Sequence, residues 1–276
     1  MLQKFIRLLT TLDPLAPVDL FLDQIFPRSC YQCAVNLDMD ELGVCGSCWM
    51  QVRGLTGKYC SICGSPRDLK RSNFQNHCKS CRNGSNLFVQ AACIGFFEPP
   101  LNEMIHYLKY IEGRLYWKKR QASFAGRFFA RRMAQIFPSR RRIAQTTVIM
   151  PVPLHPSKLK KRGYNQSELL AAPLSEYVSI PMDTTSLIRV IDTVSQTTLD
   201  AKSRRENVEN AFKVVDPDRI KGEKVLLIDD VLTTGSTING CASKLLDNGV
   251  DQVCVMTIAR AKGGNNKIDE YPQNDG

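Results

Sequence analysis

The chain has 276 residues, of which 43% are hydrophobic and 23% charged, and its formal net charge is +10. This composition is typical of a globular protein with room for one large core and an accessory module, or for two domains. It argues against a membrane-spanning helix, because no run of about 18 apolar residues is present.

The first region in chain order, residues 1–25, is expected to form a helical segment. It carries Lys4 and Arg7, but Pro14 and several polar residues interrupt its apolar run and no small-residue cleavage site follows. A secretory signal therefore fits poorly. We expect a cytoplasmic protein, with a peripheral position at the inner face of the membrane as an open alternative.

Residues 26–85 contain eight of the eleven cysteines, arranged as four CxxC pairs. Two residues between thiolates let a tight turn direct both sulfurs at one metal ion, and two such turns complete a tetrahedral site. Because this region has few large apolar residues, bound metal would have to supply its folding energy. We predict a double zinc ribbon with two closed structural sites, formed by Cys30, Cys33, Cys45 and Cys48 and by Cys60, Cys63, Cys78 and Cys81.

Other states of these cysteines remain open. The CxxC turns could pair in an interleaved order, and disulfides or iron–sulfur ligation are weaker alternatives, since thiols in the cytoplasm are normally reduced. His77 lies beside Cys78 and is interpreted as a bystander. The other cysteines, which lie in apolar surroundings, are expected in the core: Cys93, Cys241 and Cys254.

Residues 86–260 alternate between apolar runs and amphipathic stretches. Strands are predicted at 87–97, 146–153, 224–229 and 251–260, and helices at 101–112, 115–137, 165–178 and 236–248. The alternation predicts a doubly wound, mostly parallel α/β sheet. The polar tail, residues 261–276, is expected to be disordered.

Basic residues gather in the first half of this region. Residues 101–162 include 15 Lys or Arg residues and only two acidic ones, a field that favours polyanions such as nucleic acid. With Tyr110, Tyr116 and Trp117 nearby, these side chains could bind single-stranded DNA. Solvated helix faces and aromatic side chains in the core are the alternative. The DNA-binding candidates are Lys118, Lys119, Arg120, Arg127, Arg131, Arg132, Arg140, Arg141 and Arg142.

Two aspartates follow the apolar run "KVLLI", and a hydroxyl-rich loop leads from them into a helix. Ligands of open parallel sheets bind at the carboxyl ends of the strands, and a helix N-terminus favours phosphate. Carboxylates suit sugar hydroxyls or hydrated Mg²⁺. The pattern predicts a ribose 5-phosphate site, and the missing Gly-Lys-Ser/Thr step excludes a Walker nucleotide loop. Its residues are Asp229, Asp230, Val231, Leu232, Thr233, Thr234, Gly235, Ser236 and Thr237.

This stretch, residues 225–237, resembles the phosphoribosyl pyrophosphate (PRPP) signature of type I phosphoribosyltransferases. Residues 151–167 and 189–212 are similar to two further signature blocks of the ComF family, and "IHYLKY" resembles that family's early helix. The resemblance covers about residues 20–260. It implies a type I phosphoribosyltransferase-like sheet domain behind a double zinc ribbon, PRPP bound with Mg²⁺, and a link with competence and the uptake of external DNA.

The same blocks suggest ligand contacts outside the loop. The turn at residues 151–153 could present N–H groups to pyrophosphate, and Arg162 could neutralise phosphate charge in bidentate fashion. The polar segment around Arg204 is interpreted as a mobile lid, with an ordinary surface connection as the alternative. Lys158, Lys160 and Lys161 are expected on a solvated face. The pyrophosphate and lid candidates are Pro151, Val152, Pro153, Arg162, Asn165, Gln166, Arg204, Asn207 and Lys109.

Three functions remain open from the sequence. The resemblance implies a PRPP-binding protein of natural competence that handles internalised single-stranded DNA, with DNA-uptake and recombination proteins as partners. An active phosphoribosyltransferase that uses a nucleobase, an amine or ammonia is the second. A PRPP sensor or adaptor without turnover is the third. No segment can be assigned to an acceptor pocket, so no catalytic residue is predicted.

Overall fold

The computed structural model describes residues 29–30, 32–37, 43–55, 59–66, 77–111, 115–192 and 210–262, with the side chains of 115–118 excepted. The helical segment predicted at residues 1–25 lies outside these ranges, as do most of the polar tail and the lid candidates Arg204 and Asn207.

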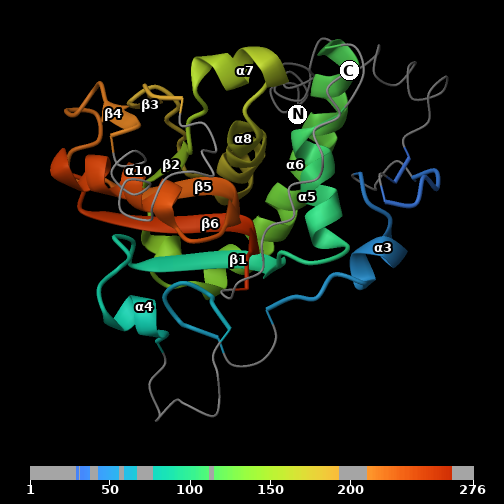
Figure 1. Ribbon diagram of the computed structural model, residues 1–276, viewed down its shortest axis with the longest axis horizontal. Helices are drawn as coiled ribbons and strands as arrows, with labels where there is room; N and C mark the ends of the chain where they lie inside the picture. Colours follow the sequence, from blue (N-terminus) through green and yellow to red (C-terminus); the bar gives the residue numbers. More distant parts are fainter. Residues whose placement is uncertain are drawn as a thin grey trace, which may run out of the picture.

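A parallel sheet forms the centre of the described chain (Figure 1). Its strands run in the order β1-β6-β5-β2, and every neighbouring pair is parallel. The strands are β1 (Gln90–Phe96), β2 (Val148–Pro151), β5 (Lys224–Leu232) and β6 (Gln252–Arg260). This arrangement confirms the predicted parallel α/β sheet. Apolar residues dominate the two central strands because both faces of the sheet are covered.

Helices cover the two faces of the sheet and divide its core. On one face, Leu226 and Met256 pack with α5 (Leu101–Lys109), α6 (Leu115–Ile136) and α8 (Gln166–Val178). On the other, Leu227 and Val255 pack with α10 (Ser236–Asp247). The alternation follows from the two-residue period of a strand. The remaining elements are α3 (Gly46–Met50), α4 (Lys79–Arg82), α7 (Pro156–Arg162), the antiparallel pair β3 (Leu187–Arg189) and β4 (Phe212–Val214), and the 3₁₀ turns Phe137–Ser139 and Ile143–Gln145.

The two cysteine ribbons join different halves of this core. The first belongs to the α6 side, where the ring of Trp49 meets that of Phe128 edge-on with centroids 4.9 Å apart. The second belongs to the α10 side through Cys60 and Cys63. In Figure 1, α3 lies beside α6 and α4 lies below β1, so the ribbons are separate bodies beside the edge strand.

The connector between the ribbons and the first turn of the second ribbon both contact the outer edge of β1. Gly54 forms an antiparallel bridge with Gly95, and the Ala91 amide donates to the Ile62 carbonyl over 2.5 Å. A Cβ added at Gly95 would lie 2.7 Å from the carbonyl oxygen of Arg53. Only glycine permits this approach, which covers the peptide groups of an edge strand.

The structure differs from the predicted elements in three places. The strand predicted at 224–229 continues to Leu232, so Val231 and Leu232 pair with β6 instead of belonging to the loop. No element was predicted at 156–162, where α7 forms between Pro156 in its first turn and Gly163, which has a φ of +85°. The β3–β4 pair was missed because it joins distant segments. None of the helices in the described ranges is long and apolar enough to cross a membrane.

Helices α6 and α8 touch at Gly126. A Cβ added there would lie 2.4 Å from the carbonyl oxygen of Leu169. Alanine normally stabilises a helix relative to glycine, but here we expect Gly126→Ala to destabilise the fold by about 2 kcal/mol, since the helices must separate. Urea denaturation measures the change. Gly46→Ala, whose added Cβ would meet nothing within 4 Å, is the control, and an equal effect of both would contradict the prediction.

Candidate functional site

The acidic pair lies near the carboxyl end of β5, where two helices reach it. From the first turn of α8, Ser167 Oγ donates to Asp229 Oδ1 over 3.2 Å and Gln166 Nε2 donates to Asp230 Oδ2 over 3.0 Å. From the end of α5, Lys109 Nζ lies 3.0 Å from Asp230 Oδ1. Segments about sixty and one hundred and twenty residues away from the aspartates therefore converge on them.

Burial governs the charges of this cluster. Asp230 is only 4% exposed. Burial, aided by the charge of Asp230, raises the pKa of Asp229 to about 7, although Lys109 acts in the opposite direction. Burial alone would lower the pKa of Lys109, but the charge of Asp230 outweighs it and raises that pKa. The pair therefore shares the charge of Lys109, and Asp229 holds its proton to a higher pH than an ordinary aspartate does.

The hydroxyl loop joins β5 to α10. Gly235 caps the helix with a φ of +84°, and Thr234 Oγ1 lies 2.9 Å from Ser236 Oγ. Helix α10 has 12 residues, and the amide of its first residue, Ser236, donates to Thr234 Oγ1 over 3.4 Å. The other amides of its first turn lack a carbonyl partner within the helix and lie at the positive end of the helix dipole. Together with the exposed Thr234 hydroxyl, this end of the helix can bind a phosphate group.

Arg162 also belongs to the cluster around the acidic pair. It donates to Gln166 Oε1, and its guanidinium lies 5.4 Å from the centre of the Tyr110 ring. The structure therefore brings Lys109, Arg162 and Gln166 together with the aspartates. Tyr110, considered above as a base-stacking residue, packs with Arg162 here.

The turn at residues 151–153 bonds to β5 and does not present the free N–H groups that were expected of it. The Val152 amide donates to the Ile228 carbonyl over 2.9 Å, and the prolines on either side have no amide proton. The expectation that these residues offer N–H groups to pyrophosphate is therefore wrong. Asn165, 2% exposed, accepts from the Ser167 amide over 3.0 Å and donates to the Val152 carbonyl over 3.1 Å. It positions α8.

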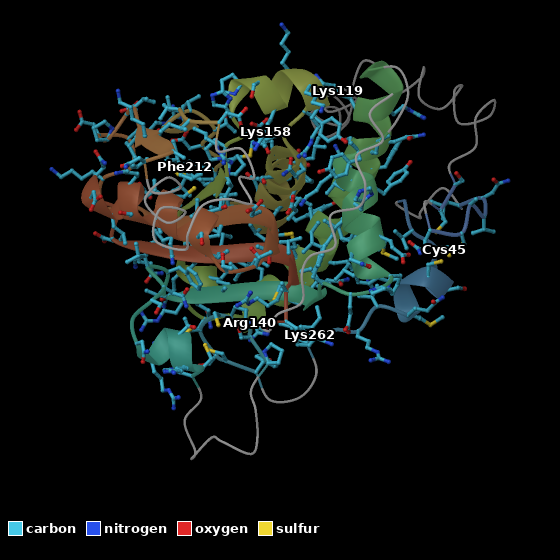
Figure 2. The ribbon with its side chains drawn as sticks, in the orientation of Figure 1. Cys45, Lys119, Arg140, Lys158, Phe212 and Lys262 are labelled. Carbon is cyan, nitrogen blue, oxygen red and sulfur yellow. The ribbon has the colours of Figure 1, made fainter. Side chains whose placement is uncertain are left out.

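The predicted DNA-binding residues do not form one surface. Figure 2 places Lys119 near the top of the view and Arg140 in its lower half, below β1. The guanidinium of Arg132 lies 4.8 Å from the Trp49 ring centre, and Arg140 donates to the Tyr59 hydroxyl over 3.3 Å. Both side chains are half-buried against residues of the cysteine ribbons, and their role in DNA binding stays a prediction. Lys118 has no described side chain, and among the other members of the set the exposed ones are Lys119, Arg127, Arg131, Arg141 and Arg142.

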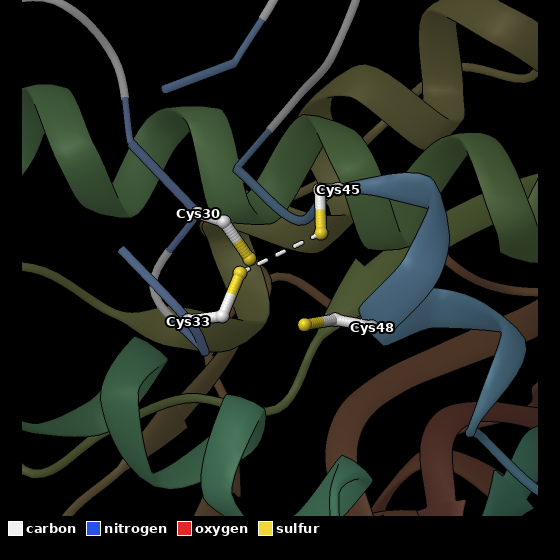
Figure 3. A group of neighbouring side chains, drawn as sticks. All are labelled: Cys30, Cys33, Cys45 and Cys48. Carbon is white, nitrogen blue, oxygen red and sulfur yellow. Dashed lines mark hydrogen bonds between the residues drawn. The ribbon is translucent and has the colours of Figure 1, made fainter. Parts of the chain in front are cut away.

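The eight paired cysteines form two clusters in sequential order, which resolves the question of pairing: Cys30, Cys33, Cys45 and Cys48, and Cys60, Cys63, Cys78 and Cys81. Figure 3 shows the four side chains of the first cluster pointing toward one centre. Within each cluster all sulfurs lie within 4.8 Å of one another. Tetrahedral zinc with Zn–S bonds of about 2.3 Å requires S–S distances of about 3.8 Å, and the Cys33–Cys45 and Cys63–Cys78 sulfurs are 3.7 and 3.6 Å apart. Both clusters fit zinc.

Two further residues, Ser167 and Arg260, shape the site but were not among those predicted from the sequence. Ser167 lies next to Gln166 in the first turn of a predicted helix. Its hydroxyl group at that position was the one feature of the sequence that could have marked it as a site residue. Arg260 ends β6 and donates to the carbonyls of Leu232 and Thr233 at the start of the hydroxyl loop. A single cation at the end of the apolar run "QVCVMTIAR" could have marked it, because a buried charge needs partners.

Family models match both parts of the chain. Residues 21–82 match a double zinc ribbon domain and residues 165–274 a phosphoribosyl transferase domain. With the parallel sheet and the two cysteine clusters, these matches define a phosphoribosyltransferase-fold protein that carries a double zinc ribbon.

Several named proteins are similar over most of their length. Competence protein F of Haemophilus influenzae is 32% identical over 86% of this chain and 98% of its own, and DNA utilization protein YhgH of Escherichia coli K12 is 30% identical over 85% and 97%. Competence protein ComFC of Bacillus subtilis is 25% identical over 79% and 84%. The chain belongs to the ComF, or competence protein F, family. Among solved structures, a glutamine PRPP amidotransferase from B. subtilis is 16% identical and covers 55% of this chain and 30% of its own, with a TM-score of 0.36.

Proposed function

We propose that the chain binds PRPP with Mg²⁺ where β5 gives way to α10, and that it acts in the use of external DNA during natural competence. The observation that carries the binding proposal is the acidic pair, with Asp230 buried and Asp229 half-buried, next to a helix N-terminus rich in hydroxyl groups. The relatives named as competence and DNA utilization proteins support the biological role.

Each part of the ligand has a matching group. Loop amides and hydroxyls of residues 233–237 would hold the 5-phosphate. The carboxylates of Asp229 and Asp230 would accept from the ribose hydroxyls or hold hydrated Mg²⁺, which prefers carboxylate oxygens. Arg162 and Lys109 would face the pyrophosphate as fixed cations. Mg²⁺, when bound, would neutralise pyrophosphate charge.

Calorimetric titration of the full chain with PRPP tests the proposal. We expect Mg²⁺-dependent binding in the wild-type chain and at least about 100-fold weaker binding in Asp229→Ala/Asp230→Ala, because bonds to charged groups contribute about 1.5–3 kcal/mol each. The matched control is Asp216→Ala/Asp218→Ala, which removes two exposed carboxylates. Unchanged binding in the first variant, or an equal loss in both, would refute the ribose site.

Turnover is a separate question with a separate readout. A wild-type chain that releases pyrophosphate from bound PRPP when a nucleobase, amine or ammonia is added is an active phosphoribosyltransferase. Binding without release across that panel of acceptors identifies a sensor or adaptor.

Single-stranded DNA is the macromolecular ligand that the exposed basic residues of α6 favour. Arg127 and Arg131 are four residues apart and both exposed, so they lie on one face of α6. If both contact phosphates, Arg127→Gln/Arg131→Gln should lower the slope of log K against log salt by about 1.4. Fluorescence anisotropy with an oligonucleotide measures it. Lys160→Gln/Lys161→Gln on α7 is the control, and the absence of binding at low salt would rule out this role.

A further inference from the structure

Arg260 occupies a buried position between the hydroxyl loop and the second cysteine cluster. It is the last residue of β6, opposite Leu232 of β5 and Phe96 of β1, and it is only 8% exposed. Its place at the carboxyl edge of the sheet puts a permanent positive charge directly behind the candidate phosphate site.

The guanidinium bonds both neighbours at once. On one side, Nε donates to the Cys63 carbonyl over 3.0 Å and Nη2 donates to Ser65 Oγ over 2.7 Å. On the other side, Nη1 donates to the Leu232 carbonyl over 2.6 Å and to the Thr233 carbonyl. One planar group therefore holds a metal-binding turn and the first residues of the loop in a fixed relation.

A second set of bonds joins the same two parts. Asn239 in the first turn of α10 accepts from the Leu87 amide over 3.1 Å and donates to the Ser85 carbonyl over 2.9 Å. Between these two residues, Asn86 Nδ2 donates to Cys81 Sγ over 3.1 Å. The helix N-terminus is thus bonded to the segment that leads from Cys81, the last cysteine of the second cluster, to β1.

The first cluster lacks such a connection within the described residues. Its ribbon contacts α5 and α6, through Gln32 with Glu103 and Trp49 with Phe128. The two clusters have the same four-thiolate composition but different neighbours. The first cluster can therefore serve as an internal control, because among the described residues only the second cluster adjoins the hydroxyl loop.

Charge supports the same connection. All four acceptors of Arg260 are neutral, and a buried cation with neutral partners alone is costly. Zn²⁺ with four thiolates carries a net negative charge. The metal site beside the Cys63 turn would supply the compensating charge, and the loop carbonyls use the remaining donors of the guanidinium.

We propose that Arg260 is a positioning residue that couples the metal of the second cysteine cluster to ligand binding at the hydroxyl loop. With metal bound, the Cys63 turn is rigid, and Arg260 holds the Leu232 and Thr233 carbonyls so that the following amides point at the phosphate. Without metal, the turn loses its order and the loop loses its anchor. This inference rests on the proposed PRPP site.

Coupling between two sites is reciprocal, so PRPP must tighten metal binding at the second cluster. The test measures zinc affinity of the full chain by competition with a chromogenic chelator, with and without PRPP and Mg²⁺. Cys33→Ser leaves the second cluster intact, and Cys78→Ser leaves the first. We expect PRPP to raise zinc affinity about tenfold in Cys33→Ser and to leave it unchanged in Cys78→Ser.

Arg260→Lys should abolish the tenfold effect in the Cys33→Ser chain while the cluster still binds zinc, because lysine cannot bond four acceptors in one plane. Ser65→Ala, which removes one acceptor, is the milder variant and should reduce the effect if Arg260→Lys does not fold. An equal PRPP effect on both clusters, or an undiminished effect in these variants, overturns the inference. A wild-type chain that binds no PRPP overturns the proposed function itself, and a chain that binds PRPP without any change in zinc affinity overturns the inference alone.

Discussion

Removal of zinc is expected to unfold both cysteine ribbons and to expose Trp49 to water. Structural zinc sites contribute about 10–16 kcal/mol of apparent binding free energy, as much as a whole domain's stability. The Trp49 ring packs against Phe128 and Arg132. Because Trp49 follows Cys48 in α3, loss of the first cluster should break these contacts. Since the chain has two tryptophans, a Trp117→Phe background isolates its emission, which should shift to longer wavelength on chelation and return when zinc is added.

Zinc content provides the control for this result. We expect two zinc ions per wild-type chain, one in Cys33→Ser, and two in Cys93→Ser, because Cys93 is buried but belongs to neither cluster. Emission that does not change in the metal-free chain, or a Cys93→Ser chain that loses zinc, would contradict the assignment of the clusters.

Lys109→Met is expected to destabilise the chain increasingly as the pH rises. Folding raises the pKa of Asp229, so the protonated carboxyl group stabilises the folded state at low pH. This contribution is lost as the pH rises from about 4, the ordinary pKa of an aspartate, to about 7, its pKa in the folded chain. Without Lys109, which opposes the rise, the loss continues above pH 7. At alkaline pH we expect about 3 kcal/mol, the lower end for a broken buried pair, because the Lys109 side chain is 26% exposed.

Urea denaturation at pH 6 and pH 8.5 measures this difference. Asp230→Asn in the same chain should restore most of the lost stability, since the unpaired charge disappears with it. Lys160→Met, at an exposed position, should have little effect at either pH. A destabilisation by Lys109→Met that is independent of pH, or that Asp230→Asn does not relieve, would show that the ion pair is not its cause.

The features predicted correctly are those that local spacing encodes. The CxxC turns predict metal clusters because each turn places two thiols side by side, and an apolar strand followed by acids and a hydroxyl loop predicts the position of the acidic pair. The involvement of Lys109 could be suggested only through family resemblance, since no local pattern relates it to Asp230, 121 residues further along the chain.

Features that depend on contacts between distant residues could not be predicted. Arg260 bonds to Cys63 and Ser65 across 197 and 195 residues, and no pattern around Arg260 names those partners. Arg132 and Arg140 look like surface charges in the sequence, yet each has an aromatic partner in the cysteine ribbons. The sequence of a basic helix therefore shows how many cations it carries, but it does not show which of them contact another part of the chain.

The contact between Gly54 and Gly95 has a consequence for any shortened form of this protein. Deleting the ribbons would strip the outer strand of the sheet of the chain that shields it, and bare strand edges recruit other strands. An isolated phosphoribosyltransferase-like domain would therefore tend to aggregate even if each of its helices and strands remained intact. The metal-binding region thus covers an edge of the sheet domain, and a charged residue placed on β1 would be the simplest substitute for that cover.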